Sequence, residues 1–366
     1  MDRPFHSLVL PGIIISVLLF QSCALESSQT HSASGESTDQ ATVLNEVFHT
    51  DRDEGDNVDS PAVWHGPDGQ NWLLATAKEG DTIIAYDASN GSLIQRFGEG
   101  GEGAGQFERP NGIAVIDNLV LVVERDNRRI QLFTLPDFES IGFLNHEELR
   151  LPYGLTVYKT ENDSYQLYVT DNFNPYLEGY PAVEELDERV HHFSFRFSDG
   201  ILSGEHQRVF GDITGEGILH KVESICADPF HNRLLIADEA FSQRSVKIYD
   251  LDGNFTGEMI PNDYFSSEPE GIALYSCDDG SGYWIMTDQH ESDENKFQLF
   301  DRESLTHIGT FKGEITRNTD GIWLTQHSFG DFEQGAFYPV HDDGSVTAIS
   351  WAEISQAFNL DLDCRM

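Results

Sequence analysis

The stretch Asn111-Gly112-Ile113 opens a strand-like run in which a polar side chain is followed by a small residue and then by an aliphatic one. The pattern recurs, more loosely in its first copy, at Asp59-Ser60-Pro61-Ala62-Val63, Tyr153-Gly154-Leu155, Glu223-Ser224-Ile225, Glu270-Gly271-Ile272 and Asp320-Gly321-Ile322. Counted from Asp59, successive copies lie 52, 42, 70, 47 and 50 residues apart. This is the length of a four-stranded blade, so the spacing predicts an all-β fold, a six-bladed β-propeller.

The long interval belongs to the third unit, which is enlarged by an acidic, proline-containing insertion from Asn172 to Glu188. Such a loop is either a lid over the channel mouth or a passive surface excursion. At the other end of the domain, the segment from Glu46 to His49 is expected to supply the strand that closes the ring, which would hide open sheet edges.

Equivalent positions of a propeller converge on its axis, so the polar residues of the six copies are expected to meet at the mouth of the channel. They are Asp59, Asn111, Tyr153, Glu223, Glu270 and Asp320. A ring with four carboxylates and hardly any positive charge is the donor set of a hard cation.

The chain of 366 residues is strongly acidic, with a net charge of −41 from 63 acids and 22 bases. Phosphate backbones are held by clustered Lys and Arg, and no basic stripe is present, so nucleic acid is excluded as a partner. Most of the acids are expected to be solvated surface charges, because cation binding needs only a few of them.

The first 23 residues are typical of an export signal, with Arg3, an apolar stretch from Leu8 to Phe20, and a lipoprotein-type Cys23. Residues 24–44 are predicted to be a disordered Ser/Thr-rich tether, and residues 45–366 the propeller domain. We expect a monomeric bacterial protein that is exported, either as an outer-membrane or periplasmic lipoprotein held only by its lipid anchor or as a secreted protein.

The remaining cysteines show no zinc pattern and no disulfide framework, so Cys226 and Cys277 are interpreted as small core residues. In an alternating strand, His191 and His192 would face opposite sides, and both are interpreted as structural.

Two resemblances sharpen this prediction. The second unit, from Gly105-Gln106-Phe107 to Pro110-Asn111-Gly112-Ile113-Ala114-Val115, resembles an NHL repeat, which is itself a propeller blade. The chain from about residue 50 to 355 resembles the β-propeller phytases, calcium-dependent six-bladed enzymes of the 3-phytase type. The stretches that carry the second resemblance are Gly55-Asp56-Asn57-Val58-Asp59-Ser60-Pro61-Ala62-Val63-Trp64, Glu223 with Ala237-Asp238-Glu239, Glu270-Gly271-Ile272 with Asp279-Gly280-Ser281-Gly282-Tyr283-Trp284 and Asp288-Gln289, and Thr319-Asp320-Gly321-Ile322 with Gly335-Ala336-Phe337 and Ser350-Trp351-Ala352-Glu353-Ile354.

The resemblance implies several bound Ca²⁺ ions and a phosphate-binding site. The implied metal ligands are Asp59, Glu223, Glu239, Glu270, Gln289 and Asp320, with Asp56 and Asn111 as additional ones. Lys78, Arg128 and Tyr153 match positions that contact phosphate, and together with Glu239 and Gln289 they form the implied catalytic set.

The chain departs from this family in two places. Thr170-Asp171-Asn172-Phe173 stands where the family commonly has Gly-Lys-Glu, so one phosphate-binding lysine is missing, and Ser60 replaces the second acid of the opening pair. The first change leaves the natural substrate open between phytate and smaller phosphomonoesters.

The hypothesis is a calcium-dependent phosphomonoester hydrolase that releases phosphate from myo-inositol hexakisphosphate by attack of a calcium-bound water. No Gly-x-Ser-x-Gly elbow, P-loop or Arg-His-Gly signature is present in the sequence. Two alternatives stay open. One is a non-catalytic, NHL-like binding propeller at the cell surface that calcium stabilises, and the other is a calcium-dependent lactonase or esterase.

Overall fold

The structure is a computed structural model that describes residues 41–161, 163–174, 179–292 and 294–361. The chain divides into two compact units, Met1–Asp39 and Gln40–Met366, and every described residue belongs to the second. The predicted signal peptide, Cys23 and nearly all of the predicted tether lie outside the described residues. Within the described part, no helix is long and apolar enough to cross a bilayer.

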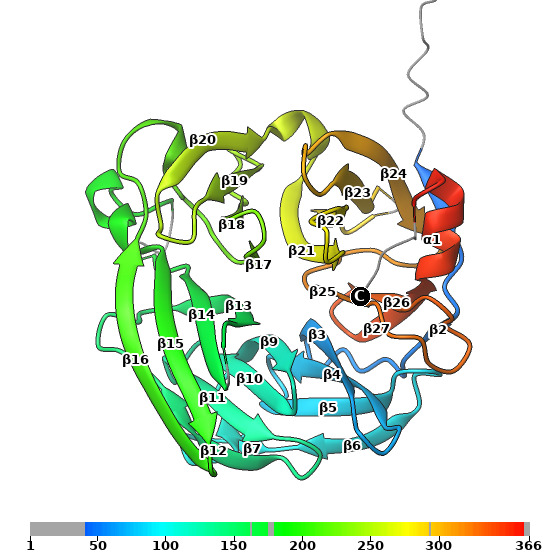
Figure 1. Ribbon diagram of the computed structural model, residues 1–366, viewed down its shortest axis with the longest axis horizontal. Helices are drawn as coiled ribbons and strands as arrows, with labels where there is room; N and C mark the ends of the chain where they lie inside the picture. Colours follow the sequence, from blue (N-terminus) through cyan, green and yellow to red (C-terminus); the bar gives the residue numbers. More distant parts are fainter. Residues whose placement is uncertain (1–40, 162, 175–178, 293, 362–366) are drawn as a thin grey trace, which may run out of the picture. The chain divides into compact units, whose positions relative to one another are not determined.

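Six antiparallel sheets stand around a central axis and form the predicted six-bladed propeller (Figure 1). Blade 1 consists of β3 (Val58–His65), β4 (Asn71–Ala77), β5 (Thr82–Asp87) and β6 (Leu93–Phe97). Blade 2 consists of β9 (Pro110–Ile116), β10 (Leu119–Glu124), β11 (Arg129–Thr134) and β12 (Glu139–Leu144). Blade 3 consists of β13 (Pro152–Lys159), β14 (Ser164–Asp171), β15 (Val190–Ser198) and β16 (Ile201–Phe210). Blade 4 consists of β17 (Ile225–Asp228), β18 (Arg233–Asp238), β19 (Ser245–Tyr249) and β20 (Phe255–Ile260).

Blades 5 and 6 complete the circle. They contain β21 (Glu268–Ser276), β22 (Gly282–Gln289), β23 (Lys296–Asp301) and β24 (His307–Gly313), and β25 (Ile322–Thr325), β26 (Ala336–His341) and β27 (Ser345–Ser350). Short elements decorate the connections, namely β7 (Glu99–Gly100), β8 (Gln106–Phe107), η1 (Val183–Glu188), η2 (Gly215–Gly217) and η3 (Asn262–Tyr264). The helix α1 (Trp351–Phe358), which the sequence reading did not anticipate, follows the last strand and buries Trp351 and Ile354.

The N-terminal part of the domain closes the ring. β2 (Phe48–His49) pairs with β27 as the outermost strand of blade 6, which confirms the expectation for Glu46 to His49. The predicted tether boundary is wrong, because β1 (Thr42–Leu44) pairs in parallel with β24 of blade 5. Leu44 is buried in the core beside β24, and burial of this apolar side chain outweighs the polar composition of the segment before it.

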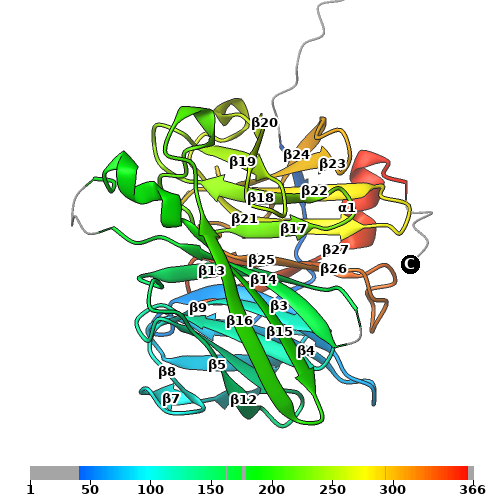
Figure 2. The same ribbon diagram turned by 60° about the vertical axis from the view of Figure 1, so that its left-hand side comes forward.

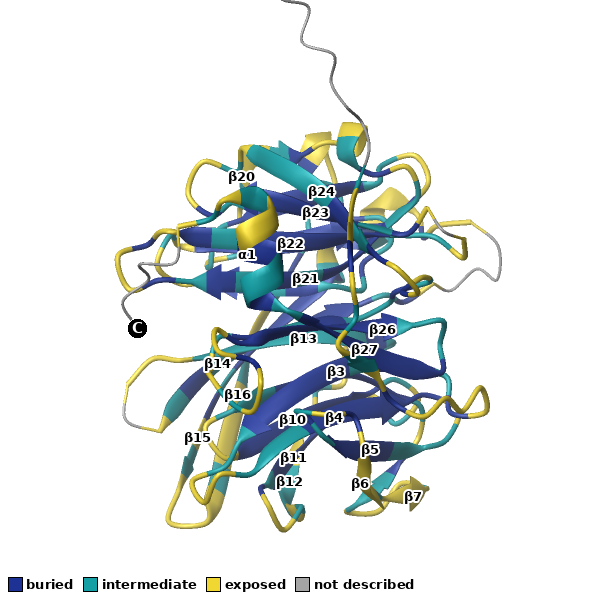
Figure 3. Cartoon of the chain, turned by 90° about the vertical axis from the view of Figure 1, so that its right-hand side faces the viewer, coloured by how far each residue is buried: buried dark blue, intermediate teal, exposed yellow. Residues whose placement is uncertain are grey.

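The apolar core lies between neighbouring blades (Figure 3). Trp64 of β3 and Val120 of β10 belong to one such cluster, between blades 1 and 2. The Trp64 indole also donates a hydrogen bond to Asn118 at 3.0 Å, so its polar atom is satisfied. The outermost strands are far more exposed, and in β6 no residue is buried.

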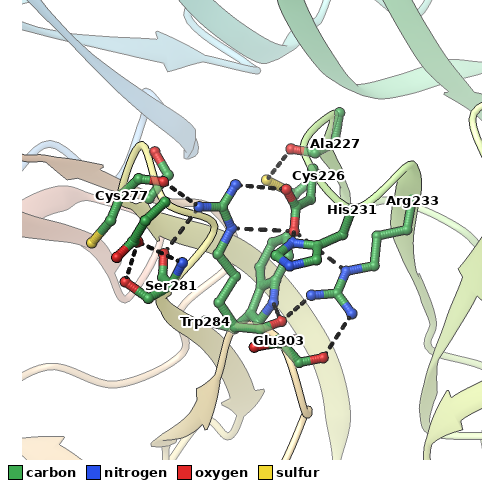
Figure 4. A network of polar contacts seen from close by, with 12 residues as sticks. Cys226, Ala227, His231, Arg233, Cys277, Ser281, Trp284 and Glu303 are labelled. Atoms are coloured by element: carbon green, nitrogen blue, oxygen red, sulfur yellow. Dashed lines mark hydrogen bonds and ion pairs between the residues drawn. The ribbon is translucent and has the colours of Figure 1, made fainter. Parts of the chain in front are cut away.

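A buried ionic network joins blades 4 and 5 (Figure 4). Asp228, at the end of β17, lies 2.7 Å from the Arg302 guanidinium and 3.3 Å from that of Arg233. Arg302 also donates to the carbonyl oxygens of Cys277 and Ser281, each at 3.0 Å. Because its charges and donors are paired, the network ties the two blades together without an orphaned buried ion.

Cys277 is buried, as expected, but it is disulfide-bonded, so the interpretation as a mere core residue is incomplete, whereas Cys226 is a free thiol. The enlarged third blade owes part of its length to β15 and β16, the two long arrows that cross the front of Figure 2. Its insertion starts at the channel, where Asn172 donates to Glu223 at 3.0 Å.

Candidate functional site at the channel mouth

The polar residue of each copy stands at or just before the start of an innermost strand, so the repeat itself places six polar side chains at one end of the axis. Neighbouring inner strands approach closely there. Gly321 N donates to Asp59 O at 2.8 Å, and a Cβ on Gly154 would lie 2.1 Å from the carbonyl oxygen of Glu223. The small residue of the motif is therefore a steric requirement of the ring.

Threonine hydroxyls on the second strands reinforce this contact. Thr76 donates to Asn111 O at 2.6 Å, and Thr170 donates to Glu223 O at 2.8 Å. The residues that follow each polar position line an axial cavity of about 260 Å³. They come from all six inner strands, and the polar residues themselves are not part of this lining. The body of the channel is thus lined mainly by small and aliphatic side chains, whereas the polar side chains of the motif stand at its mouth.

Asp59 is the centre of one half of the site. Its buried carboxylate lies 2.8 Å from Lys78 Nζ and accepts hydrogen bonds from Tyr153 and Asn111, each at 3.3 Å. Ser60, which replaces an acid of the resembled family, donates to Asp59 at 2.8 Å. The buried Oδ1 of Asn111 has no hydrogen-bond partner among the described residues.

Lys78 connects this half to Asp320. Its Nζ lies 3.0 Å from Asp320 Oδ2, and Gln289 Nε2 donates to the other oxygen of the same carboxylate. Burial disfavours the charged amine, but the charges of Asp59 and Asp320 outweigh it and raise the pKa of Lys78. Lys78 is therefore a fixed positive charge shared by two carboxylates.

Three glutamates form the other half. Ligand oxygens of Glu223, Glu239 and Glu270 all lie within 4.8 Å of one another. Lys221 reaches into this group, with Nζ 2.8 Å from Glu239 and 4.0 Å from Glu223. Its backbone also accepts a hydrogen bond from Glu239 N at 2.9 Å, which holds the two segments together.

The carboxyl groups of Glu239, Glu270 and Asp320 hold protons more strongly than ordinary ones. Burial, followed by repulsion from Glu223, raises the pKa of Glu239 well above its usual range. Burial and then Glu239 do the same to the pKa of Glu270. Burial also raises the pKa of Asp320, although Lys78 opposes the shift. With Glu268, whose Oε2 lies 3.2 Å from Lys221 Nζ, at least six carboxylates face two ammonium groups here, so the ionised site is short of positive charge.

These residues fit a calcium ion. Two oxygens that bind one Ca²⁺ at about 2.4 Å can lie no more than about 4.8 Å apart, and the ligand oxygens of the three glutamates meet this condition. The donors are oxygens throughout, as Ca²⁺ prefers. Glu239 Oε1 is buried and makes no hydrogen bond with the described residues, so an acceptor that is costly to leave unpaired is already in place.

Not every predicted residue joins the site. Asp56 is buried, and Arg96 donates to both of its oxygens, at 2.6 and 2.5 Å, in an ion pair outside the group of residues described above. Arg128 is exposed on the turn between β10 and β11, in a left-handed conformation with φ of 51°. The remaining predicted residues, Lys78, Tyr153, Asn111, Asp59, Glu223, Glu239, Glu270, Gln289 and Asp320, are brought together.

Sequence reasoning missed three members of the site. Lys221 lies two positions before the motif residue Glu223, where the repeat offers no signal. Asn172 bonds to Glu223, and Asp343, on the turn between β26 and β27, interacts electrostatically with Lys78 and Asp59. The repeat does not indicate Lys221, and its position two residues before the predicted ligand Glu223 was the one sign of it in the sequence.

Comparisons with known proteins establish no family. No family model and no curated protein sequence matches the chain. Among solved structures, the Pan2 WD40 domain of Neurospora crassa is similar over 86% of this chain and 84% of that chain, with 6% sequence identity and a TM-score of 0.48. A likeness at this level says nothing about a ligand. The six-bladed propeller follows from the strand pairing described above.

Proposed function

We propose that this propeller is a calcium-dependent phosphomonoester hydrolase that acts on a highly phosphorylated small molecule such as phytate. The observation that carries the proposal is the meeting, at one channel mouth, of a carboxylate cluster with more negative than positive charge and two amines, the buried one of Lys78 and the partly exposed one of Lys221. The phytase resemblance of the sequence motifs supports the same assignment.

The cation would be held by Glu223, Glu239, Glu270 and Asp320, with Asp59, Asn111 and Gln289 as further oxygen donors. Bound Ca²⁺ would supply positive charge that offsets the phosphoryl oxygens and a Lewis acid that activates water.

The protein's own donors would position the phosphate. Lys78 and Lys221 are charged, because the carboxylates beside them outweigh burial and raise both amine pKa values. The Tyr153 hydroxyl stays protonated, because burial and the charge of Asp59 raise its pKa, so it remains a hydrogen-bond donor. Lys221 thus places an ammonium group near Glu223, although the lysine expected at the Thr170-Asp171-Asn172 stretch is missing. Fixed donors of this kind stabilise developing phosphoryl charge.

The test is phosphate release from phytate by the purified protein, with added Ca²⁺ and with chelator. We expect release that requires Ca²⁺ and falls by about 100-fold or more in Glu270→Gln, because one buried charge of the cation site is lost. Glu258→Gln is the matched control, since Glu258 is exposed on β20 of blade 4.

Three outcomes decide between the readings. Undiminished activity in chelator would rule out a calcium enzyme. A rise in melting temperature with Ca²⁺, but no phosphate release from any phosphomonoester, would favour the binding propeller. Hydrolysis of lactones or carboxylic esters, tested on a parallel panel, would favour the lactonase reading.

A further inference from the structure

A second cluster of titratable side chains lies on the outer strands of blades 2 and 3. It consists of His146, just after β12, His191 on β15 and His206 on β16. His191 is fully buried, whereas His146 is about 30% exposed. The proposed phosphatase chemistry uses none of the three.

A β-bulge brings two of these rings to the same face. His191 pairs with Val209, and Phe193 pairs with His206, with a shift in register between His192 and Phe193. In a regular ladder, residues 206 and 209 would face opposite sides, because side chains alternate. The extra residue in β16 turns the side chain of His206 toward His191, and bulges commonly redirect a side chain in this way.

The nitrogen geometry suits one shared metal ion. His191 Nδ1 lies 3.2 Å from His206 Nε2, and the donor atoms of all three residues lie within 4.8 Å of one another. Two nitrogens bound to one tetrahedral Zn²⁺ at about 2.0–2.1 Å stand about 3.4 Å apart. The His146 ring stacks on His206, with centroids 3.8 Å apart, and its partial exposure leaves it room to turn.

A carboxylate behind His191 resembles the outer shell of a metal site. Asp171 Oδ2 lies 3.5 Å from His191 Nε2, and both residues are buried. The backbone amides of Arg150 and Leu151 donate to Asp171 at 2.7 and 2.9 Å and hold it in place. His191 Nε2 makes no hydrogen bond with the described residues, so Asp171 acts on it as a nearby negative charge, and His191 Nδ1 is the nitrogen that faces His206.

The cluster is accessible from outside. A pocket of about 230 Å³ runs along β12, β15 and β16, and His206 forms part of its wall beside Asn145, Phe193 and Glu205. Imidazole donors favour late first-row divalent metals over Ca²⁺. We propose that His146, His191 and His206 bind one such ion, with Zn²⁺ as the reference ion, at a site separate from the carboxylate cluster.

The experiment uses the full chain, stripped with chelator and then kept in excess Ca²⁺ so that the carboxylates are saturated. Titration with Co²⁺ should give visible d–d absorption from one equivalent of nitrogen-bound metal, and Zn²⁺ should displace it. His146→Gln and His206→Gln should each weaken binding by about 100-fold or more, because loss of even an outer-shell partner costs about 10- to 100-fold in metal affinity. His192→Gln, on the opposite face of β15, should leave it unchanged.

Thermal unfolding of each variant checks that it is folded, and His146→Gln should leave the core intact, because His146 is about 30% exposed. Failure of the wild type to bind Co²⁺ or Zn²⁺ tighter than about 10 µM would overturn the proposal. So would binding that is equally strong in His146→Gln and His206→Gln. In either case the three rings would be a hydrogen-bonded and stacked packing unit, whatever the calcium chemistry of the channel.

Discussion

Glu239 shows how burial and like charge act together on one residue. Its side chain is fully buried, it faces Glu223 and Glu270, and only Oε2 has a cationic partner, Lys221. Such a carboxylate is stable either with a proton or with a cation beside it, since an isolated buried charge is costly. Protons and cations should therefore compete for this residue.

This competition predicts a pH dependence of calcium binding. Because the pKa values of Glu239 and Glu270 are raised, Ca²⁺ should bind more weakly as the pH falls from about 8 to about 5, and binding should release protons. Calorimetry in buffers of different ionisation enthalpy measures both effects. An affinity for Ca²⁺ that is the same at each pH, with no release of protons on binding, would contradict the prediction.

The same pKa shifts determine whether the metal-free protein gains or loses stability as the pH rises. The folded protein keeps carboxyl protons that the unfolded chain, with a normal glutamate pKa of 4.5, has lost. Its free energy of unfolding should therefore fall as the pH rises above about 4.5 toward the raised values. The raised pKa of Lys221 affects stability only at pH values above the ordinary pKa of lysine, so it does not change this trend. Stabilisation by Ca²⁺ should then grow with pH.

Residue identity was predictable where the repeat fixes it. Asp59, Asn111 and Tyr153 are brought into contact because each occupies the same place in its blade. The pairing of Asp56 with Arg96 on β6 was not predicted, because pairing with a distant strand leaves no trace in the local sequence. Lys221 was missed for the same reason.

At the scale of elements, the inner strands are packed against one another at their first residues. The position after the polar residue is Gly154 in blade 3 and Ser224 in blade 4. In blade 3 an added Cβ would meet a carbonyl oxygen of the next blade, which is backbone and cannot rotate away. The two blades therefore tolerate different residues at equivalent sites.

Gly154→Ala should destabilise the protein by about 2–3 kcal/mol through overpacking, and it should also displace Glu223 and weaken calcium binding. Ser224→Ala is the matched control, because its Cβ is already accommodated. Urea unfolding and calcium titration of the two variants test this. Equal stability of both variants would show that the blades can separate at the axis without cost.

Element boundaries were less predictable than the repeat. Strands near Trp72 to Thr76 and Leu119 to Val123 follow from apolar runs between turn residues, and the structure contains them as β4 and β10. The helix α1 was missed, because it begins within a motif that was read as part of the last blade. The bulge in β16 depends on cross-strand register, which a single strand does not encode.

On the scale of the whole molecule, the ring depends on β2. Phe48 packs against Phe332 and Tyr338 of blade 6, each with ring centroids 6.4 Å away, and Val47 N donates to Ala348 O at 2.7 Å. The first described strands of the domain thus complete its last two blades.

Phe48→Ala should therefore lower the free energy of unfolding by about 2–4 kcal/mol, because a large aromatic contact at the closure is lost. Val47→Ala, at an exposed neighbouring side chain, should change it by less than about 0.5 kcal/mol. Urea unfolding measures the difference. If Phe48→Ala proves as stable as Val47→Ala, closure by β2 contributes little to the ring.

Lys78 and Lys221 give the acidic channel mouth two counter-ions that are part of the chain itself. Folding and metal loading can then be separate events, since the ammonium groups offset part of the carboxylate repulsion while the ring assembles. A cation that enters later must compete with these amines for the same oxygens. Each amine that it displaces becomes available to an incoming anion, so loading of the metal would itself prepare the protein to receive phosphate.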